Sequence, residues 1–404
     1  MNVFLRLTLE RCARAALAAF VGVWSVALAN PNFSITGWKA TLVAAVAATV
    51  SVPAKTPWAQ APSQAMAETR WSFSQTPRGS SEVQRAVTAL IGALVAFAVA
   101  VVLTPIAIRV ALRTGVVDRP GALKVQEVPV AYLGGVAVFG GLAAGLLVHS
   151  GRPRLLLPLA LALALGLADD LADLPPRVRL ACEAVIGVAA AVVVPAIPGP
   201  LGYVITAVAV VGLLNAVNLL DGLDALASGV AAVSAIGFAL LGPGPRPLGL
   251  ALAGALCGFL VFNRPPARIY LGDAGAYLVG TALALACASA LHADGAVTTW
   301  AALPLLVAVP VTDTAVAILR RRRAGAPLFA GDRSHVYDQL VDRGATRPRA
   351  VVVMVVAQAV LAAIGVLVGH LPPVAGVSGA LLSAGILVAL VGRGGFLTPA
   401  KEAS

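Results

Sequence analysis

One stretch of the sequence, residues 202–224, reads GYVITAVAVVGLLNAVNLLDGLD and passes from an apolar run straight into a polar cluster. The polar members of this cluster follow one another at intervals of three, as Asn215, Asn218, Asp221 and Asp224. If the helix continued through the cluster, this interval would place all four side chains on one face. Helix capping would explain one such residue. Four of them, at a depth where an Asp costs about 2.5–3.5 kcal/mol, indicate a functional site.

The composition indicates a protein whose main solvent is lipid. Of 404 residues, 59% are hydrophobic and 12% are charged, and the mean hydropathy is +0.91. Soluble domains are about one-quarter charged, so the predicted fold class is an all-α polytopic membrane protein. The net charge of +11 would suggest a nucleic-acid partner in a soluble protein. In a membrane protein such an excess of Lys and Arg first indicates cytoplasmic loops, so no nucleic-acid partner is expected.

Eleven apolar segments are long enough, or nearly long enough, to span a bilayer. Their predicted ranges are 86–108, 133–149, 154–168, 179–197, 202–218, 225–241, 247–262, 274–291, 298–318, 350–370 and 374–392. Several are shorter than the roughly 20 residues that a straight transmembrane helix needs. The polar residues at their ends are therefore expected to continue the helices beyond the apolar runs.

Three regions are predicted along the chain: an N-terminal appendage (1–84), a transmembrane domain (85–392) and a short cytoplasmic tail (393–404). In the appendage, basic residues precede an apolar run at 15–29, a layout similar to a secretory signal peptide. A second apolar run at 40–52 is followed by a linker rich in Pro, Ser and Gln. An export signal and a helical hairpin added to the membrane core are the two alternatives for this region.

The distribution of basic residues predicts the orientation of the segments. The links after the odd-numbered segments, with the C-terminal tail, contain 18 Lys and Arg: Arg109, Arg113, Arg119, Lys124, Arg177, Arg179, Arg264, Arg268, Arg320, Arg321, Arg322, Arg323, Arg333, Arg343, Arg347, Arg349, Arg393 and Lys401. The links after the even-numbered segments contain 3: Arg152, Arg154 and Arg246. Because Lys and Arg gather in cytoplasmic loops, the first set of links and the C-terminus are predicted to be cytoplasmic in a multi-pass plasma-membrane protein.

Four further polar clusters lie in the links of predicted cytoplasmic location. They are Asp118-Arg119-Pro120-Gly121 with Lys124, Asp169-Asp170-Leu171-Ala172-Asp173 with Arg177 and Arg179, the segment 263–275 (NRPPARIYLGDAG), and the segment 332–338 (DRSHVYD). Adjacent carboxylates such as Asp169 and Asp170 repel each other unless a cation or a base neutralises them. Each cluster alone could be a solvated loop, and Gly-Asp is an ordinary turn pair. Their shared membrane face favours a common site.

The residue types in these clusters favour phosphoryl chemistry. Mg²⁺ prefers one or two carboxylates, with water and substrate phosphates completing its shell. Nearby basic side chains would complement phosphate oxygens: Lys124, Arg177, Arg179 and Arg268. Carboxylates, Mg²⁺ and cations at one lipid-accessible surface suggest a reaction between a lipid phosphate and a nucleotide substrate.

Five motifs together resemble those of the polyprenyl-phosphate N-acetylhexosamine-1-phosphate transferases, the MraY/WecA-like superfamily also called glycosyl transferase family 4. They include Asp-Asp-x-x-Asp-Leu at 169–174, Asn-x-x-Asn-x-x-Asp-Gly-x-Asp at 215–224 and Asn-x-x-Pro-Ala-x-x-x-x-Gly-Asp-x-Gly at 263–275. The resemblance covers about residues 86–370, and eleven spans with cytoplasmic motifs are typical of the WecA-like branch. It implies transfer of a sugar-1-phosphate from a UDP-sugar to polyprenyl phosphate, with release of UMP and Mg²⁺ as cofactor.

The resemblance also implies roles for individual residues. Asp273 and Asn218 match metal-site residues, and the nucleotide pocket is matched by Asp221, Gly222, Asp224, Asn263 and Lys124. Asp169 and Asp170 match paired aspartates that either deprotonate the lipid phosphate or help to place it; with Asp221 they form the predicted catalytic set. Arg179 stands where Lys is usual and would bind diphosphate or lipid phosphate. The predicted substrate-binding set is completed by Asn215, Arg268, Arg333 and His335.

The last loop departs from the family pattern. It commonly reads Asp-Arg-x-His-Ile-His-His, whereas this chain has His335-Val336-Tyr337-Asp338 and keeps only the first histidine. The MraY branch, with its run of histidines, is therefore disfavoured. Donor contacts of the later histidines do not transfer to Tyr337 and Asp338. Asp313, inside the segment 298–318, matches a recurrent Asp of the family and is a structural candidate.

Several functions remain as alternatives. UDP-N-acetylglucosamine is the favoured donor, and a phospho-N-acetylmuramoyl-pentapeptide transferase is the runner-up. A secondary transporter would place ionisable residues near the bilayer midplane, often in repeated halves, whereas here they lie at one face. An inactive scaffold homologue is allowed by the altered last loop but disfavoured by the retained Asp and Asn motifs. The expected partners are a UDP-N-acetylhexosamine, polyprenyl phosphate and the bilayer, with a homodimer left open.

Overall fold

The computed structural model describes residues 78–119, 129–149, 153–325 and 335–397, with side chains described from residue 83 onward. The chain divides into two compact units, Met1–Thr88 and Ala89–Ser404. The second unit contains all the described helices except the start of the first one. The predicted appendage 1–84 lies almost entirely outside the described residues, so its two alternatives and the proposed domain boundaries stay predictions.

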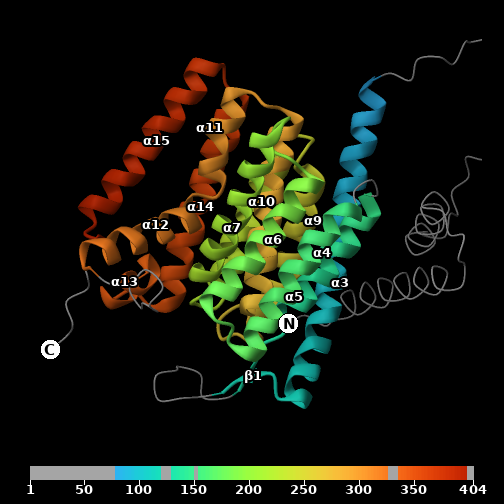
Figure 1. Ribbon diagram of the computed structural model, residues 1–404, viewed down its shortest axis with the longest axis vertical. Helices are drawn as coiled ribbons and strands as arrows, with labels where there is room; N and C mark the ends of the chain where they lie inside the picture. Colours follow the sequence, from blue (N-terminus) through green and yellow to red (C-terminus); the bar gives the residue numbers. More distant parts are fainter. Residues whose placement is uncertain (1–77, 120–128, 150–152, 326–334, 398–404) are drawn as a thin grey trace, which may run out of the picture. The chain divides into compact units, whose positions relative to one another are not determined.

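Helices make up most of the described chain (Figure 1). They are α3 (Arg78–Thr114), α4 (Gly134–His149), α5 (Leu156–Ala172), α6 (Pro176–Val193), α7 (Pro200–Leu220), α8 (Leu226–Leu241), α9 (Arg246–Asn263), α10 (Gly272–Ala293), α11 (Val297–Leu306), α12 (Ala308–Arg323), α13 (Val336–Asp342), α14 (Arg347–His370) and α15 (Pro373–Arg393), with a 3-10 turn η1 (Pro153–Leu155) before α5. Two short strands, β1 (Val117–Asp118) and β2 (Val130–Ala131), pair antiparallel.

The helices confirm a multi-pass, helical membrane protein. Among the described residues, seven helices are long and apolar enough to cross a membrane, or eight if the bent pair α11–α12 counts as one span. Each of the eleven predicted segments overlaps a helix or that pair, but the segments in α4, α6 and α8 are not among those seven. The count of eleven spans and the cytoplasmic orientation therefore stay predictions.

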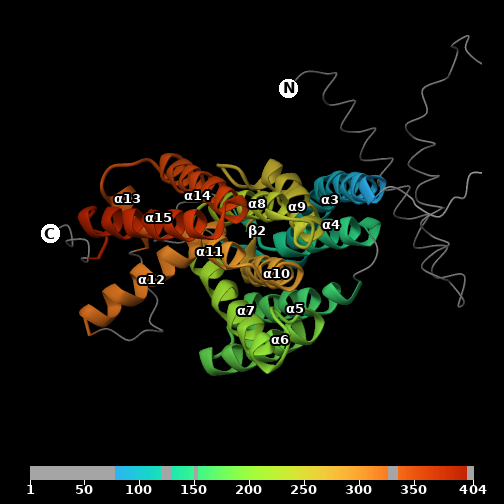
Figure 2. The same ribbon diagram turned by 90° about the horizontal axis from the view of Figure 1, so that it is seen from above.

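Helix α10 forms the centre of the second unit. It packs against α4, α5 and α7, and its side chains are buried almost from end to end. Figure 2 shows α10 between a layer containing α4, α8 and α9 and a layer containing α5, α6 and α7. The ends of the neighbouring helices therefore meet around the two ends of α10.

Small residues allow the close approach to α10. A Cβ atom at Gly166 of α5 would overlap the backbone of Asp273 and Ala274, and one at Gly135 of α4 would overlap Ala274 and Gly275. Backbones this close are typical of helix packing in lipid, where van der Waals contact between small residues drives association. The first turn of α10 is consequently held against both α4 and α5.

The segment predicted as one span at 298–318 is broken in the structure. Helices α11 and α12 meet at an angle of 69° around Val307. The Gln358 side chain of α14 lies at the break: its Oε1 accepts the Val309 N–H at 3.0 Å, and its Nε2 donates to the Leu306 carbonyl at 2.9 Å. A buried amide can thus satisfy backbone groups that a helix break leaves without partners.

The β1–β2 hairpin, which the sequence patterns did not predict, connects the helix ends near the polar clusters. Ala131 of β2 bridges Ile269 in parallel. The Gly134 and Gly135 amides at the start of α4 donate to the carbonyls of Tyr270 (3.1 Å) and Leu271 (3.0 Å). The N-termini of α4 and α10 therefore lie side by side at the same end of the unit as β1.

Candidate active site

Asp170, near the C-terminus of α5, caps the N-terminus of α10. Its Oδ1 accepts the Asp273 N–H at 2.9 Å and its Oδ2 accepts the Ala274 N–H at 3.1 Å. A carboxylate on the free N–H groups of a helix is stabilised by those donors and by the positive end of the helix dipole. Gly272, with φ of +71°, makes the turn that aims these amides at Asp170. Two predicted site residues are thereby joined directly.

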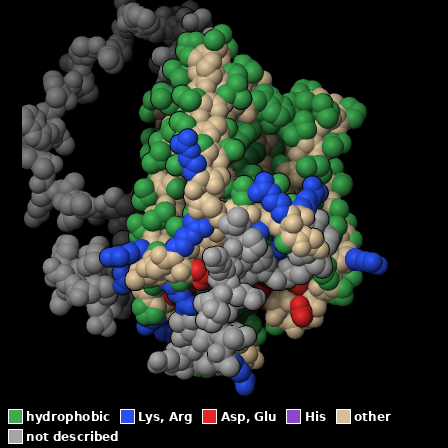
Figure 3. Space-filling view, turned by 90° about the vertical axis from the view of Figure 1, so that its left-hand side faces the viewer, with side chains coloured by type: hydrophobic (Ala, Val, Ile, Leu, Met, Phe, Trp, Pro, Cys, Tyr) green, Lys and Arg blue, Asp and Glu red, His purple; other side chains and the backbone are tan. Residues whose placement is uncertain are grey.

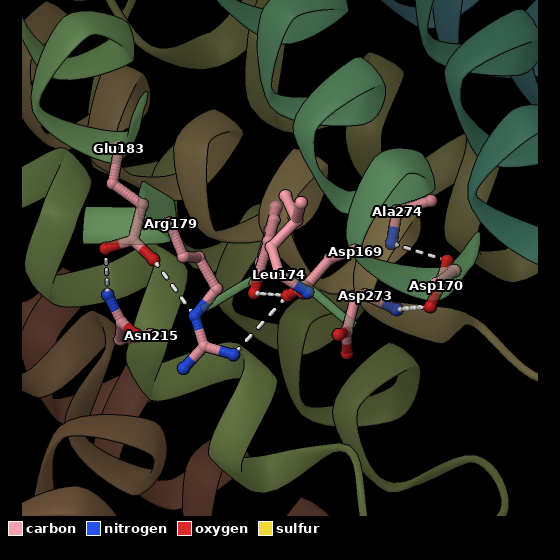
Figure 4. Close-up of polar contacts among 9 residues, drawn as sticks. Asp169, Asp170, Leu174, Arg179, Glu183, Asn215, Asp273 and Ala274 are labelled. Carbon is pink, nitrogen blue, oxygen red and sulfur yellow. Dashed lines mark hydrogen bonds and ion pairs between the residues drawn. The ribbon is translucent and has the colours of Figure 1, made fainter. Parts of the chain in front are cut away.

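Asp169 binds three donors, of which Leu174 and Arg179 are labelled in Figure 4. The Tyr277 hydroxyl of α10 donates to Oδ2 at 2.6 Å, and the Leu174 N–H donates to Oδ1 at 2.9 Å. Arg179 of α6 approaches Oδ2 with Nη1 at 3.4 Å. Asp169 is only 6% exposed, so these donors compensate a carboxylate removed from water.

A second carboxylate, Glu183 of α6, holds Arg179 from the other side. The distance from Arg179 Nε to Glu183 Oε1 is 3.7 Å, and Glu183 is 1% exposed. Its other oxygen accepts the Asn215 Nδ2–H of α7 at 2.6 Å. Asp169, Arg179, Glu183 and Asn215 thus form one chain of polar contacts across α5, α6 and α7, as Figure 4 shows.

The expectation that Asn215, Asn218, Asp221 and Asp224 share one face of a continued helix is wrong for the last two. Helix α7 ends at Leu220, and Asp221 is its C-cap residue with φ −80° and ψ 46°. The Asp221 N–H donates to the Asn218 carbonyl at 3.1 Å, and the chain then turns through Gly222. Asp and Gly favour turns for their local hydrogen bonding and backbone freedom, and here this preference ends the helix.

The turn at the end of α7 is tied to the segment that follows α9. Asp224 Oδ2 accepts the Ala267 N–H at 2.9 Å. Asp221 is half-buried, and its pKa is raised from 3.8 to about 7, first by burial and then by Asp170 and Asp224, with partial relief from the Gly272 amide. A carboxyl with this pKa exchanges its proton near neutral pH.

The buried Asn263 side chain connects two segments of the site by hydrogen bonds. The side chain is 3% exposed; its Oδ1 accepts the Ala225 N–H (3.1 Å) and the Ser228 hydroxyl (2.7 Å), and its Nδ2 donates to the Ile269 carbonyl (2.9 Å). Both ends of the amide therefore hold the α7–α8 turn against the segment before α10. Arg268, by contrast, lies exposed on that segment and is available to an anion from solvent.

Asp273, predicted as a metal residue, lies in the first turn of α10 among other carboxylates. The carboxylates that act on it electrostatically include Asp170, Asp169 and Asp221. Within the described residues, no three His, Cys, Asp or Glu side chains are grouped closely enough to hold a metal alone. Mg²⁺ requires only one or two carboxylates when substrate phosphates and water supply the rest, so this donor set fits it.

His335 and its neighbours lie at the start of α13 in a buried contact with α12. His335 Nδ1 is 2.7 Å from Asp313 Oδ2, and Asp313 Oδ1 accepts the Val336 N–H at 2.7 Å. These contacts agree with the structural role expected for Asp313. The Tyr337 hydroxyl donates to the Leu219 carbonyl of α7 at 3.3 Å. Lys124 and Arg333, two further predicted site residues, lie outside the described residues.

Three residues at the site were not selected from the sequence. Tyr277 stands four residues after Asp273 on α10, a spacing that places both on one side of the helix. Glu183 is an acidic residue inside an apolar segment, which is itself a functional signal. Tyr132 follows β2; burial and then Asp273, Asp221 and Asp170 raise the pKa of its phenol. No sequence pattern distinguishes Tyr132, because its closeness to the carboxylates depends on the hairpin.

Basic side chains are unevenly distributed on one face of the molecule. Figure 3 shows Lys and Arg mainly in the lower part of the face that it draws, with hydrophobic side chains above them. This is the same end at which β1 and α13 lie in Figure 1. On this face, most of the basic residues therefore lie towards the end of the helices at which β1 lies.

Comparison with known proteins agrees with the motifs. Residues 153–291 match the sequence profile of glycosyl transferase family 4. A putative glycosyltransferase of Streptomyces coelicolor is 35% identical over 75% of this chain and 75% of that protein. A probable undecaprenyl-phosphate N-acetylglucosaminyl 1-phosphate transferase of Bacillus subtilis is 27% identical over 67% of this chain and 82% of that protein.

A third relative, a decaprenyl-phosphate N-acetylglucosaminephosphotransferase of Mycobacterium tuberculosis, is 29% identical over 60% of this chain and 73% of that protein. The matched region of the family profile contains Asp169, Asp170, Asn218, Asp221 and Asp273. The chain belongs to glycosyl transferase family 4.

Proposed function

We propose that this protein transfers N-acetylglucosamine-1-phosphate from UDP-N-acetylglucosamine to polyprenyl phosphate and releases UMP. An oxygen of the polyprenyl phosphate attacks the phosphorus that carries the sugar, and the bond from that phosphorus to the UMP oxygen breaks. The proposal is supported by relatives that are named for transfer of this sugar phosphate to undecaprenyl or decaprenyl phosphate. It would be the first membrane step of cell-envelope polysaccharide synthesis.

The observation that carries the proposal is the meeting of five helix ends, three of which carry carboxylates. Asp169 and Asp170 come from α5, Asp221 and Asp224 from the end of α7, and Asp273 from the start of α10. The ends of α4 and α9 adjoin them through backbone and Asn263 hydrogen bonds. A site at the ends of apolar helices would give a lipid phosphate and a water-soluble nucleotide access to the same carboxylates.

We assign positioning roles to the paired aspartates. Both carboxylate oxygens of Asp170 accept hydrogen bonds from α10 amides. Asp169 binds Tyr277, Arg179 and the Leu174 amide. Both side chains therefore hold parts of the site in place. An ionised lipid phosphate needs little activation at neutral pH, which favours placement over deprotonation. If Asp169→Asn left turnover and its pH profile unchanged, neither role would stand.

A metal ion would be held by Asp273 and Asn218, with Asp221 close by. When bound, Mg²⁺ would neutralise charge on the diphosphate and on the leaving UMP. Arg179 lies between Asp169 and Glu183, which fixes its guanidinium where an acceptor or donor phosphate could use its remaining N–H groups. Arg268 is exposed on the segment after α9, next to Ala267, whose amide binds Asp224. It would contact the nucleotide from the solvent side.

The orientation and the partners follow from the same argument. The excess of Lys and Arg in the links of the site's end of the helices supports a cytoplasmic site and a cytoplasmic C-terminus, by the positive-inside rule. The location would be the plasma membrane, with the chain working alone or as a homodimer.

A donor panel tests the proposal. Purified protein is incubated with Mg²⁺, polyprenyl phosphate and one of several UDP-sugars, including UDP-N-acetylglucosamine and the muramoyl-pentapeptide donor. Mg²⁺-dependent UMP release with the first donor is expected. Turnover of the pentapeptide donor alone would move the assignment to the peptidoglycan reaction. Absence of UMP with every donor would exclude the enzyme and leave the transporter or scaffold alternatives.

A further inference from the structure

Tyr337, which stands where the family commonly has a histidine, lies against the turn at the end of α7. Its hydroxyl donates to the Leu219 carbonyl at 3.3 Å. A Cβ atom at Gly222 would overlap the Tyr337 hydroxyl and the adjacent ring edge, so the ring packs directly on the backbone of that turn. Tyr337 is only 6% exposed, so its ring is a buried packing partner of this turn and not a surface residue.

The Tyr337 ring is itself fixed from the side of α12. It stacks on the His335 ring with a centroid distance of 5.5 Å and an interplanar angle of 5°. His335 Nδ1 lies 2.7 Å from Asp313 Oδ2, and the His335 N–H donates to Asp338 Oδ2 at 3.3 Å. The first turn of α13 therefore has two anchors, one on α12 and one within its own capping box.

The far side of α13 is tied to the segment after α15. The Gln339 Nε2–H donates to the Phe396 carbonyl at 3.0 Å, and Arg343 Nη1 donates to the Gly394 carbonyl at 2.5 Å. The Arg343 guanidinium also lies over the Phe396 ring, 4.2 Å from its centroid. With contacts on both sides, α13 is a rigid support for the Tyr337 ring.

We propose that Tyr337 is a positioning residue for the nucleotide-sugar donor: it sets the place of Gly222 and, through the backbone, of Asp221 and Asp224. This inference rests on the proposed function, since it assigns the turn to the donor side. On its other side, the turn is held by the bond from the Ala267 amide to Asp224 and by the bond from the Ala225 amide to Asn263. Removing the Tyr337 ring would leave Gly222 facing an empty volume and let the two carboxylates shift.

Substitution of Tyr337 tests the inference, because it should change the KM for the UDP-sugar and leave the KM for polyprenyl phosphate nearly unchanged. Tyr337→Ala is expected to raise the KM for the UDP-sugar about tenfold or more, the size of a lost buried contact of about 1.4 kcal/mol. The KM for polyprenyl phosphate should stay within about twofold. Tyr337→Phe keeps the packing and loses one neutral hydrogen bond, so a rise of only about two- to fivefold is expected.

Leu340→Ala is the matched control, because Leu340 lies on the same helix and packs in the same apolar cluster. It should leave the donor KM within about twofold. An equal rise in donor KM for Leu340→Ala and Tyr337→Ala, or an equal rise in both substrates' KM values, would overturn the inference, because loosening of α13 alone would then explain the effect.

Gly222→Ala supplies the reciprocal experiment. The added methyl group overlaps the Tyr337 hydroxyl, so Gly222→Ala alone should impair donor binding, and combination with Tyr337→Ala should cost less than the product of the two single effects. Independent, multiplicative effects would contradict the contact. Direct titration of UDP-N-acetylglucosamine with Mg²⁺ into each folded variant gives a readout without turnover. Turnover by wild-type protein with an unchanged donor KM in Tyr337→Ala would sink the inference and leave the proposed function standing.

Discussion

Two regions of the molecule hold the candidate site by different means. Between α5 and α10, carboxylates bind backbone amides and a phenol at 2.6–3.1 Å, with Arg179 alongside. Between α13 and α7, an aromatic ring fills space beside Gly222 and makes one neutral hydrogen bond. The first region keeps the family's motifs and the second departs from them. We therefore expect loss of charge to have the larger effect at α5–α10, and loss of side-chain volume to have the larger effect at α13.

The largest effect is expected from Asp170→Ala, which removes the cap of α10. Loss of two charge-assisted bonds at a helix N-terminus costs about 1–3 kcal/mol of stability, and kcat should fall by about 10²-fold or more because Asp273 loses its placement. Turnover assays and thermal unfolding in detergent measure the two effects.

Asp294→Ala is the control for this prediction. Asp294 follows the opposite end of α10, where its Oδ1 accepts the Ala296 N–H (3.1 Å) and its Oδ2 accepts the Thr299 hydroxyl (3.3 Å). It should lower stability to a similar degree and leave kcat within about twofold. If both variants lost kcat equally, activity would depend on the stability of α10 and not on Asp170.

A tenfold loss of kcat, roughly, is expected from Tyr277→Phe. The substitution removes the 2.6 Å bond to Asp169 and leaves a buried carboxylate with one donor fewer. Tyr203→Phe, on the exposed side of α7, should have no measurable effect. A shift in donor KM instead of kcat would place Tyr277 with the α13 region and erase the distinction between the two regions.

The sequence could predict the positions of the helices but not the contacts of individual side chains. Apolar runs predicted every long helix, and the motif order predicted that Asp169, Asp170 and Asp273 share one end, because helix length fixes which ends meet. The partner of each side chain was not predictable. Whether Asp170 binds a metal or the α10 amides depends on an approach that Gly166 permits, which only packing reveals.

The features that the sequence analysis did not predict depend on local turn preferences or on contacts between distant parts of the chain. The end of α7 at Leu220 is a local turn preference overriding a three-residue periodicity. The bend at Val307 was hidden inside an apolar run and depends on Gln358, 51 residues later, to satisfy the broken backbone. The packing of Tyr337 on Gly222 is also long-range, so the departure from the family motif at Tyr337 gave no indication of this contact.

A pH effect of a few degrees in thermal midpoint is expected from Asp221. Its pKa rises from 3.8 to about 7 on folding, so the folded state binds the proton more tightly. The contribution of Asp221 to the free energy of unfolding is then greatest below about pH 4, and it falls as the pH rises towards 7. Without Mg²⁺, wild-type protein should lose more thermal stability than Asp221→Asn between pH 5 and 8. Parallel curves for the two proteins would contradict the assignment.

The smallest effect is expected from Arg343→Ala. This variant removes the Arg343 contacts with the segment after α15 but leaves the Gln339–Phe396 bond and the His335–Asp313 contact, so the donor KM should rise only about twofold with kcat unchanged. Arg349→Ala, an exposed change at the start of α14, is the control. A larger effect than that of Tyr337→Ala would show that the tail, and not the ring, governs the turn.

The most direct test of a polyprenyl-phosphate sugar-phosphate transferase is UMP release by the purified, folded protein with UDP-N-acetylglucosamine, polyprenyl phosphate and Mg²⁺. The predicted result is one UMP for each lipid-linked N-acetylglucosamine, dependent on both substrates and on the metal, and lost in Asp170→Ala but not in Asp294→Ala. UMP release absent from the wild-type protein, or equally retained in Asp170→Ala, would contradict it.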